Sequence, residues 1–504
     1  LLHSFEYEDA REAFKEAQKQ DASMPMAYWG EAMTYNHSLW QEQDYENAIK
    51  ALAPLKDINL EKKATELEQD FIKAVQVLYE PDTEKSKRDI DYSNFMEGLL
   101  IKYPSNHEVA AFYALSLLGS VPDGRDDTIY GKGAIIANGI LKENPKHPGA
   151  LHYLIHSYDD PDHATMALDA ANAYSKVAPD ASHALHMPSH IYVALGMWDQ
   201  VISSNINSYQ ASLNRMARKK LDNDARGYHA FHWLEYGYLQ KENKEEAKKM
   251  LLEMQQFTNE KPSKVARMHL VFLKGTYLVD TEEWDSELAN IKVDISDLNV
   301  SIRSQYHFLE GIKAFSKGNI KQLDSMITLM EKDYSRESFL ASSQGASFCS
   351  GISRDKATSS DIVESQIRQN QLLALRASLE ANSTLAETYF LKSIEIEKEL
   401  NDEAGIAINY NNIGDNYLKQ GDYEIADNYF TKSLKIAKEL ADEQLKAIIY
   451  LNYSELNNKI NNYNAAIFYG TQSLDISRRT GVLDVQLDAL TNISLAYEKL
   501  GSNS

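Results

Sequence analysis

The stretch INYNNIGDNYLKQGDYEIADNYFTKSLKIA, residues 408–437, recurs in outline every 40 residues toward the C-terminal end of the chain. Ala386, Ala426 and Ala466 occupy the same place in three successive copies, and aromatic residues recur in register with them. A small residue lets two helices approach closely, so this spacing predicts a repeated pair of packed helices. We expect one structural unit for each period.

The signature positions of one copy resemble the tetratricopeptide repeat family. They are occupied by Tyr410, Ile413, Gly414, Tyr417, Ala426 and Phe430. The resemblance implies an all-α solenoid of helix-turn-helix units wound as a right-handed superhelix in two sub-arrays. It also implies that the first helix of each pair lines the concave inner surface, chiefly through positions 2, 5, 9, 12 and 13 of the unit.

The N-terminal half fits the same unit less regularly. Prolines at positions 104, 145 and 179 mark joints between units, since proline cannot continue a helix. Further helix pairs are expected at about 227–256, 264–292 and 301–332. The chain therefore divides into a divergent array at 1–333, a joint rich in Ser and Gly at 334–362, and a regular array at 363–504.

Composition limits the class of protein and its partners. The formal charge is -22, which disfavours nucleic acid phosphates and anionic lipid as general partners. No apolar run is long enough to span a bilayer. The single Cys349 forms no internal disulfide, and the chain starts without Met, so the sequence leans slightly toward an exported protein.

Histidines gather in three consecutive units of the N-terminal array. In the repeat frame that the resemblance supplies, seven of the nine slots at positions 2, 5 and 9 of these units are histidine. They are His152, His156, His183, His186, His190, His229 and His232. Such clustering predicts that these side chains converge on the concave groove.

A transition-metal site is one interpretation of this cluster. His152 with His156, and His186 with His190, stand four residues apart, which places two imidazoles on one helix face. Imidazole suits Zn, Fe, Cu or Ni. The nearby groups predicted to orient the rings or add donors are Asp159, Asp160, Glu235 and Tyr236. If one ion is shared by three units, His156, His190 and His232 must lie within about 5 Å of one another.

Other residues are candidates for a peptide-binding groove. The same frame puts Trp29, Met33, Asn36 and His37 on a first-helix face near the N-terminus, although such an aromatic and methionine stripe is usually core. In the regular array the groove positions are Asn411, Asp415, Leu451 and Glu455. This neutral to acidic lining fits an extended peptide or another helix.

Two functions remain open from the sequence. The first is a scaffold that binds a protein or peptide partner, with the histidine cluster as a polar groove for an acidic peptide or small anion, or as packing. The second is a metal-dependent enzyme, hydrolytic or oxidative. Phosphate-binding glycine loops, HExxH and GxSxG are absent, and no general base is identifiable, so we rank the scaffold first.

Overall fold

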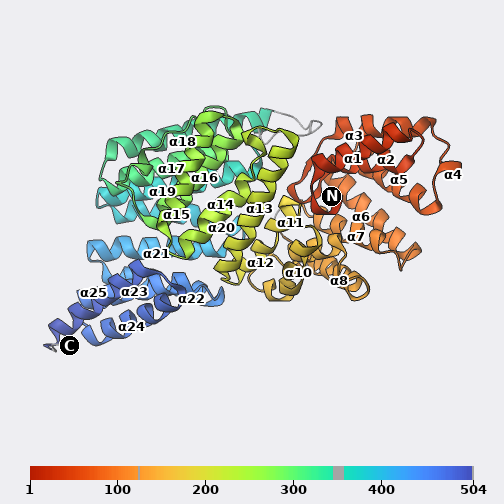
Figure 1. The fold of residues 1–504 in the computed structure, drawn as a ribbon. Coiled ribbons are helices and arrows are strands. Elements are labelled where there is room, and N and C mark those ends of the chain that lie inside the picture. The colour runs from red at the N-terminus through yellow and green to blue at the C-terminus, as the bar shows by residue number, and fades with distance from the viewer. Residues whose placement is uncertain (123–124, 344–356, 502–504) are drawn as a thin grey trace. The chain divides into compact units, whose positions relative to one another are not determined.

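The described residues fold mostly into α-helices, and most of these helices pack on the helix that follows (Figure 1). The computed structural model describes residues 1–122, 125–343 and 357–501. Residues 1–122 and 125–269 form unit 1, and residues 270–343 and 357–501 form unit 2. None of the described helices is both long and apolar enough to cross a bilayer.

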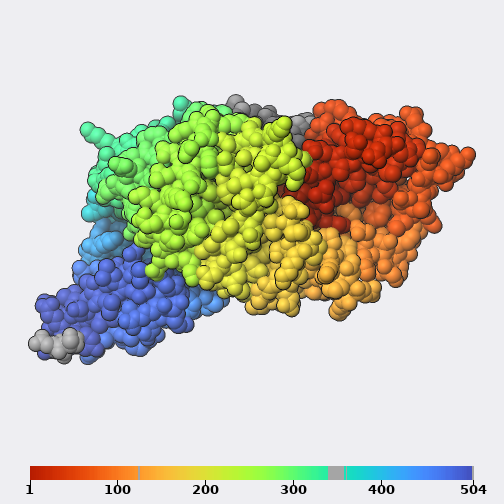
Figure 2. Space-filling view, viewed as in Figure 1, coloured from red at the N-terminus to blue at the C-terminus, as the bar shows by residue number. Residues whose placement is uncertain are grey.

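Unit 1 is drawn in red to yellow-green in Figure 2. Its elements are η1 (Leu2–Ser4), α1 (Tyr7–Gln20), α2 (Pro25–Met33), β1 (Asn36–His37), η2 (Ser38–Trp40), β2 (Glu42–Gln43), α3 (Tyr45–Leu52), η3 (Ala53–Asp57), α4 (Leu60–Lys63), α5 (Glu66–Leu78), α6 (Lys85–Lys102), α7 (His107–Gly119), α8 (Asp127–Glu143), α9 (Pro148–Ser157), α10 (Ala164–Val177), α11 (Ser182–His186), α12 (Pro188–Ala194), α13 (Trp198–Lys219), η4 (Asn223–Ala225), α14 (Tyr228–Gln240) and α15 (Lys244–Glu260). The expected joints at the three prolines all lie between helices.

Alanines sit where neighbouring helices of unit 1 meet. Ala150 of α9, Ala167 and Ala171 of α10 and Ala184 of α11 are fully buried in one apolar core. A methyl group at these contacts keeps the helix axes close, which is the packing that the repeat pattern predicts. The first helices α7, α9 and α12 also contact one another in succession. This succession brings side chains of α9 and α12 to a common face.

The region after α2 departs from the expected helix. The helix ends at Met33, and the chain then forms a short antiparallel hairpin in which Asn36 pairs with Gln43 and His37 with Glu42. The Gln43 side chain donates to Asn36 Oδ1 at 2.8 Å, which ties the hairpin together. Asn36 and His37 therefore do not share a groove face with Trp29, as the repeat frame suggested.

Unit 2 contains η5 (Leu288–Asn290), α17 (Val300–Ser316), α18 (Ile320–Ser343), α19 (Ser359–Leu379), α20 (Ser383–Glu399), α21 (Glu403–Gln420), α22 (Tyr423–Glu439), α23 (Glu443–Lys459), α24 (Tyr463–Thr480) and α25 (Leu483–Lys499). The division between the units lies within α16 (Lys264–Thr281). The pair expected at 264–292 is not formed, because α16 is followed by extended chain and η5 only.

The 40-residue period appears in unit 2 as stacked helix pairs. Ala386, Ala426 and Ala466 are all fully buried, and α21, α23 and α25 contact one another in succession. Gly421 ends α21 with φ +89°, a left-handed conformation that glycine adopts at low cost. Gly414 faces the ring of Phe430 so closely that a side chain would collide with it. The all-α repeat fold is confirmed.

The predicted division of the chain differs from the observed units. The array expected at 1–333 is divided at residue 269, since helices from 270 onward pack with the C-terminal repeats. The joint expected at 334–362 begins inside α18 and ends inside α19. Its central part, residues 344–356, lies outside the described residues.

Candidate functional site

Six histidines of unit 1 form two neighbouring groups of three. We call His152, His156 and His183 trio A, and His186, His190 and His229 trio B. Within each trio one nitrogen of every ring lies within 4.8 Å of the other two. The two trios are neighbours, since the ring centroids of His156 and His190 are 6.2 Å apart, but they share no histidine. Six of the seven histidines predicted to converge therefore do lie together, but they form two groups and not one.

Each trio is built from the same positions of two successive units. The pair four residues apart comes from one unit, on α9 in trio A and on α11 and α12 in trio B, and the third histidine comes from the start of the next unit's first helix. His152 and His156 of α9 meet His183 of α11. Likewise, His186 at the end of α11 and His190 of α12 meet His229 at the start of α14.

Trio A centres on the Nε2 atom of His152. This atom lies 3.1 Å from Nε2 of His183 and 3.1 Å from Nε2 of His156. The other ring nitrogen, Nδ1, donates to the carbonyl oxygen of His3 at 2.6 Å. Because a neutral imidazole carries one hydrogen, Nε2 of His152 is left with a lone pair that faces both neighbours.

Trio B contains two rings whose hydrogens are fixed on Nδ1. The Asn205 amide donates to the Val201 carbonyl, which turns its oxygen toward His186 Nδ1 at 2.7 Å. His190 Nδ1 donates to Asp159 at 2.7 Å. Both Nε2 atoms therefore carry lone pairs, and they face each other at 3.2 Å. Two lone pairs at this distance repel each other unless positive charge lies between them.

Burial keeps most of these rings uncharged at neutral pH. Loss of hydration lowers the pKa of His152, His156, His183 and His186 well below the ordinary histidine value, and neighbouring histidines lower it further. Neutral imidazole is the form that coordinates transition metals. The trios thus offer preformed nitrogen donors.

The two trios differ in their surroundings. Trio A is closed off by aromatic rings, since Phe5 lies 4.4 Å and Tyr174 lies 5.2 Å from the His152 ring. Trio B is more open, because His229 is exposed while Trp233 packs against His190 at 4.6 Å. Trio B is therefore the side of the site that solvent reaches.

Several groups around the trios were missed by the sequence analysis. They are His3, Phe5, Trp40, Tyr174 and Asn205, which contact the rings from distant parts of unit 1. No local pattern marks them. Trp233 could have been predicted from the sequence, because it stands four residues after His229 on the same helix face.

Other candidates lie away from the trios. Asp160 pairs with Arg125 at 2.7 Å and with His163 at 2.7 Å. Tyr236 packs against Trp198. Of the proposed orienting groups, Asp159 contacts a trio ring, whereas Asp160 and Tyr236 are engaged elsewhere. Glu235 is fully buried on α14.

His232 belongs to neither trio. Its pKa is lowered to about 4 by burial and by the nearby His269. The grouping of His156, His190 and His232 that a single shared ion required is therefore not the one that forms.

The N-terminal groove candidates are also corrected. Trp29 and Met33 are 8% and 5% exposed and belong to an apolar core, where Trp29 packs on Phe71 and Phe112. A stripe at helical spacing was core here because α5 and α7 cover it. His37 instead stacks on Tyr7 at 4.1 Å.

A third histidine group is already satisfied by a carboxylate. Glu108 lies 2.8 Å from His3 Nε2 and 3.3 Å from His147 Nε2. These two histidines lower the pKa of Glu108 strongly. The carboxylate supplies the charge that the rings need, so this group is explained without a cation.

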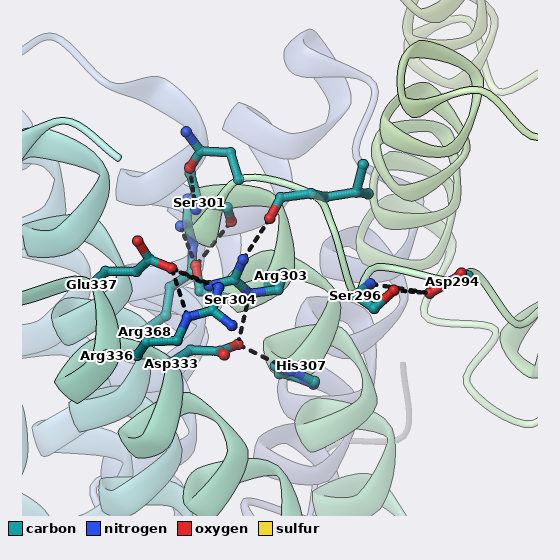
Figure 3. A network of polar contacts seen from close by, with 12 residues as sticks. Asp294, Ser296, Ser301, Arg303, Ser304, His307, Asp333, Arg336, Glu337 and Arg368 are labelled. Atoms are coloured by element: carbon teal, nitrogen blue, oxygen red, sulfur yellow. Dashed lines mark hydrogen bonds and ion pairs between the residues drawn. The ribbon is translucent and has the colours of Figure 1, made fainter. Parts of the chain in front are cut away.

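A polar network in unit 2 surrounds a cleft of about 330 Å³ (Figure 3). Arg303 is 5% exposed and bonds to Asp333 at 3.0 Å and to Glu337 at 2.9 Å. Arg336 pairs with the same Glu337, and Asp333 also faces His307. Since carboxylates neutralise these cations, the network stabilises unit 2 and offers no clear anion site.

In the C-terminal array, α21 and α23 bring their groove residues side by side. Asn452 donates to Asn411 at 2.9 Å across the two helices. Asp415 pairs with Lys419, and Glu455 lies 3.8 Å from Lys459. Leu451 is half-buried beside them. The lining is polar with one apolar side chain.

Comparison with known proteins gives matches to the repeat family and to solved structures. The tetratricopeptide repeat model matches residues 373–439 and 405–479. No curated protein matches the chain. A human IFIT1 dimer with m7Gppp-AAAA is 13% identical with a TM-score of 0.43, over 99% of this chain and 95% of that chain. A human IFIT1 dimer with PPP-AAAA is 12% identical with a TM-score of 0.42, over 99% and 95%.

At these TM-scores the likeness to IFIT1 carries no statement about function. It also gives no support to the expectation that nucleic acid is excluded as a partner, which stays a prediction from net charge. The repeat match rests on different ground, because it covers the stretch whose buried alanines and glycine turns are described above. Residues 373–479 therefore form tetratricopeptide repeats, as their match to the family model shows.

Proposed function

We propose that this protein is a tetratricopeptide scaffold whose unit 1 binds a transition metal through its histidine trios. The observation that carries the proposal is the contact between His186 and His190, whose Nε2 lone pairs face each other at 3.2 Å. Such a contact is stable only with positive charge between the nitrogens. The charge is either a proton, which makes one ring an imidazolium, or a metal ion.

The third nitrogen donor in each trio favours the metal over the proton. Two nitrogens bound to one tetrahedral ion at ordinary Zn–N lengths stand roughly 3.3 Å apart. The observed contacts of 3.1 and 3.2 Å fit this value, and they fit an N–H···N hydrogen bond as well. A proton would also serve one pair of nitrogens only, whereas a third donor converges in each trio.

The surrounding groups suit a metal site as well. His152, His186 and His190 each give the Nδ1 hydrogen to an oxygen acceptor, which directs Nε2 into the site. All-imidazole donors fit Zn, Cu, Ni or Fe. A bound ion of this kind supplies Lewis acidity or redox chemistry, so the alternative of a metal-dependent enzyme stays within the proposal.

The repeats support a scaffold for binding partners. For unit 2 we favour a protein or peptide that lies along α21 and α23, over Asn411, Asp415, Leu451 and Glu455. Neighbouring first helices present these side chains together, and polar groups around one leucine suit several modest contacts.

Metal analysis of protein purified without a polyhistidine tag tests the proposal. The protein is loaded with Zn(II), dialysed and assayed by mass spectrometry of the elements, and we expect stoichiometric metal. The double variant His152→Ala, His190→Ala should lose it. The matched control is His107→Gln with His163→Gln, two histidines paired to carboxylates outside both trios, which should keep it. Wild-type protein without stoichiometric metal after loading with Zn, Cu, Ni or Fe overturns the proposal.

A further inference from the structure

The two trios repeat one arrangement, shifted along the chain by one unit. In each, a pair four residues apart meets a histidine from the start of the next first helix. The pair His152 and His156 corresponds to His186 and His190. A single metal site needs only one such set of three histidines. The repetition of the set in the next unit therefore suggests two equivalent metal sites.

One ion is too small to serve both trios. Nitrogens bound at about 2.1 Å to a common ion lie at most about 4.2 Å apart. The ligand nitrogens of each trio meet within 4.8 Å, close to this limit. The six rings fall into two such groups of three, and no ring belongs to both groups.

Each trio also contains a nitrogen–nitrogen contact for which the neutral rings provide no straight hydrogen bond. In trio A, the one lone pair of His152 Nε2 faces two ring nitrogens, and a single lone pair accepts only one straight hydrogen bond. In trio B, the hydrogens of His186 and His190 are both held on Nδ1. A cation placed in one trio leaves the conflict in the other.

Resting on the proposed function, we propose that unit 1 holds two metal ions, one in trio A and one in trio B. The ion in trio A is enclosed by Phe5 and Tyr174, whereas the ion in trio B lies beside the exposed His229. Three protein ligands leave one position for water or a small ligand. The ion in trio B therefore has the open position that solvent and small anions reach.

Stoichiometry measured on single variants tests this arrangement. After Zn(II) loading and dialysis, the full chain should hold two ions, and His183→Gln or His190→Gln should each hold one. His229→Gln gives a second trio B variant, and because His229 is exposed, we expect this variant to fold as the wild type does. His163→Gln, outside both trios, should keep two ions. Circular dichroism confirms that each variant is folded.

The outcomes separate this inference from the proposed function. If the wild-type protein binds no ion, both the proposed function and this inference are overturned. One ion that is lost in only one of the two trio variants leaves the proposed function standing and overturns the second site. Two ions that persist in both variants place the metal elsewhere and also overturn the inference.

Two further measurements report on position and access. With Cu(II) in both trios, the EPR spectrum should show dipolar coupling, because ions bound to His156 and His190 lie at most about 13 Å apart. A chelator should remove Zn(II) faster from His183→Gln, which keeps trio B, than from His190→Gln, which keeps trio A. Uncoupled Cu(II) spectra, or a faster release from trio A, would contradict the arrangement.

Discussion

His186 and His190 direct their Nε2 atoms toward each other across 3.2 Å, while each ring gives its Nδ1 hydrogen to a different oxygen. The acceptor for His186 is Asn205 on α13, and the acceptor for His190 is Asp159 in the turn after α9. Both rings are thereby fixed as donors of lone pairs toward one point. This arrangement requires a proton or a metal ion between the two nitrogens.

Metal should raise the thermal stability of unit 1. An ion that binds only the folded state at 100 times its Kd adds about 2.7 kcal/mol. For a unit of this size, such a gain corresponds to a rise in Tm of roughly 5 to 10 °C. Fluorescence melting with and without Zn(II) measures it, because Trp29, Trp40, Trp198 and Trp233 all lie in unit 1. An unchanged Tm after EDTA treatment of loaded protein would count against metal binding.

Asp159→Asn should weaken the metal in trio B. The carboxylate accepts the Nδ1 hydrogen of His190, and loss of such a partner lowers metal affinity by about 10- to 100-fold. Competition with a chromophoric chelator gives the affinity. Asp162→Asn, an exposed neighbour in the same turn, is the control and should bind as the wild type does. Equal affinity in both variants would show that Asp159 does not orient the ligand.

Stability of the C-terminal repeats should fall as pH rises from about 4.5 to 6. Burial raises the pKa of Glu397 to about 6, even though Asn409 donates two hydrogen bonds to it. The folded state then binds more protons than the unfolded state in this window, so the free energy of unfolding decreases with pH, by on the order of 2 kcal/mol.

Urea unfolding at both ends of that window measures the effect. Glu397→Gln should remove this part of the pH dependence, whereas Glu395→Gln, an exposed carboxyl on the same helix, should retain it. If the wild type and Glu397→Gln change equally with pH, Glu397 is not the group responsible.

Gly414→Ala should destabilise the C-terminal repeats. An added Cβ would lie 2.5 Å from Cε1 and 2.6 Å from Cδ1 of Phe430, inside the core between α21 and α22. Overpacking of this kind costs about 1 to 3 kcal/mol. Smaller side chains at position 430 should relieve the clash, so in a double-mutant cycle Phe430→Leu should cost less in the Gly414→Ala background than alone. Additive effects would mean that the ring moves aside freely.

The regular repeats of unit 2 were predictable because their information is local. Ala386, Ala426 and Ala466 recur at one period, and each recurrence buries the same face against the next helix. The division at residue 269 was not predictable in this way. It depends on which helices pack together, and the irregular N-terminal units carry too little periodicity to show it.

The sequence by itself determined that six histidines share one face of successive helices. The spacing of four residues and the repeat frame together set the helix face on which each side chain lies. Only the tertiary structure decided how they pair into trios and which nitrogen carries hydrogen. His152 takes its acceptor from His3, 149 residues away, and His186 takes its acceptor from Asn205 on another helix. Helical periodicity sets the face on which a side chain lies, but the hydrogen position on a ring is set by whatever packing brings against it.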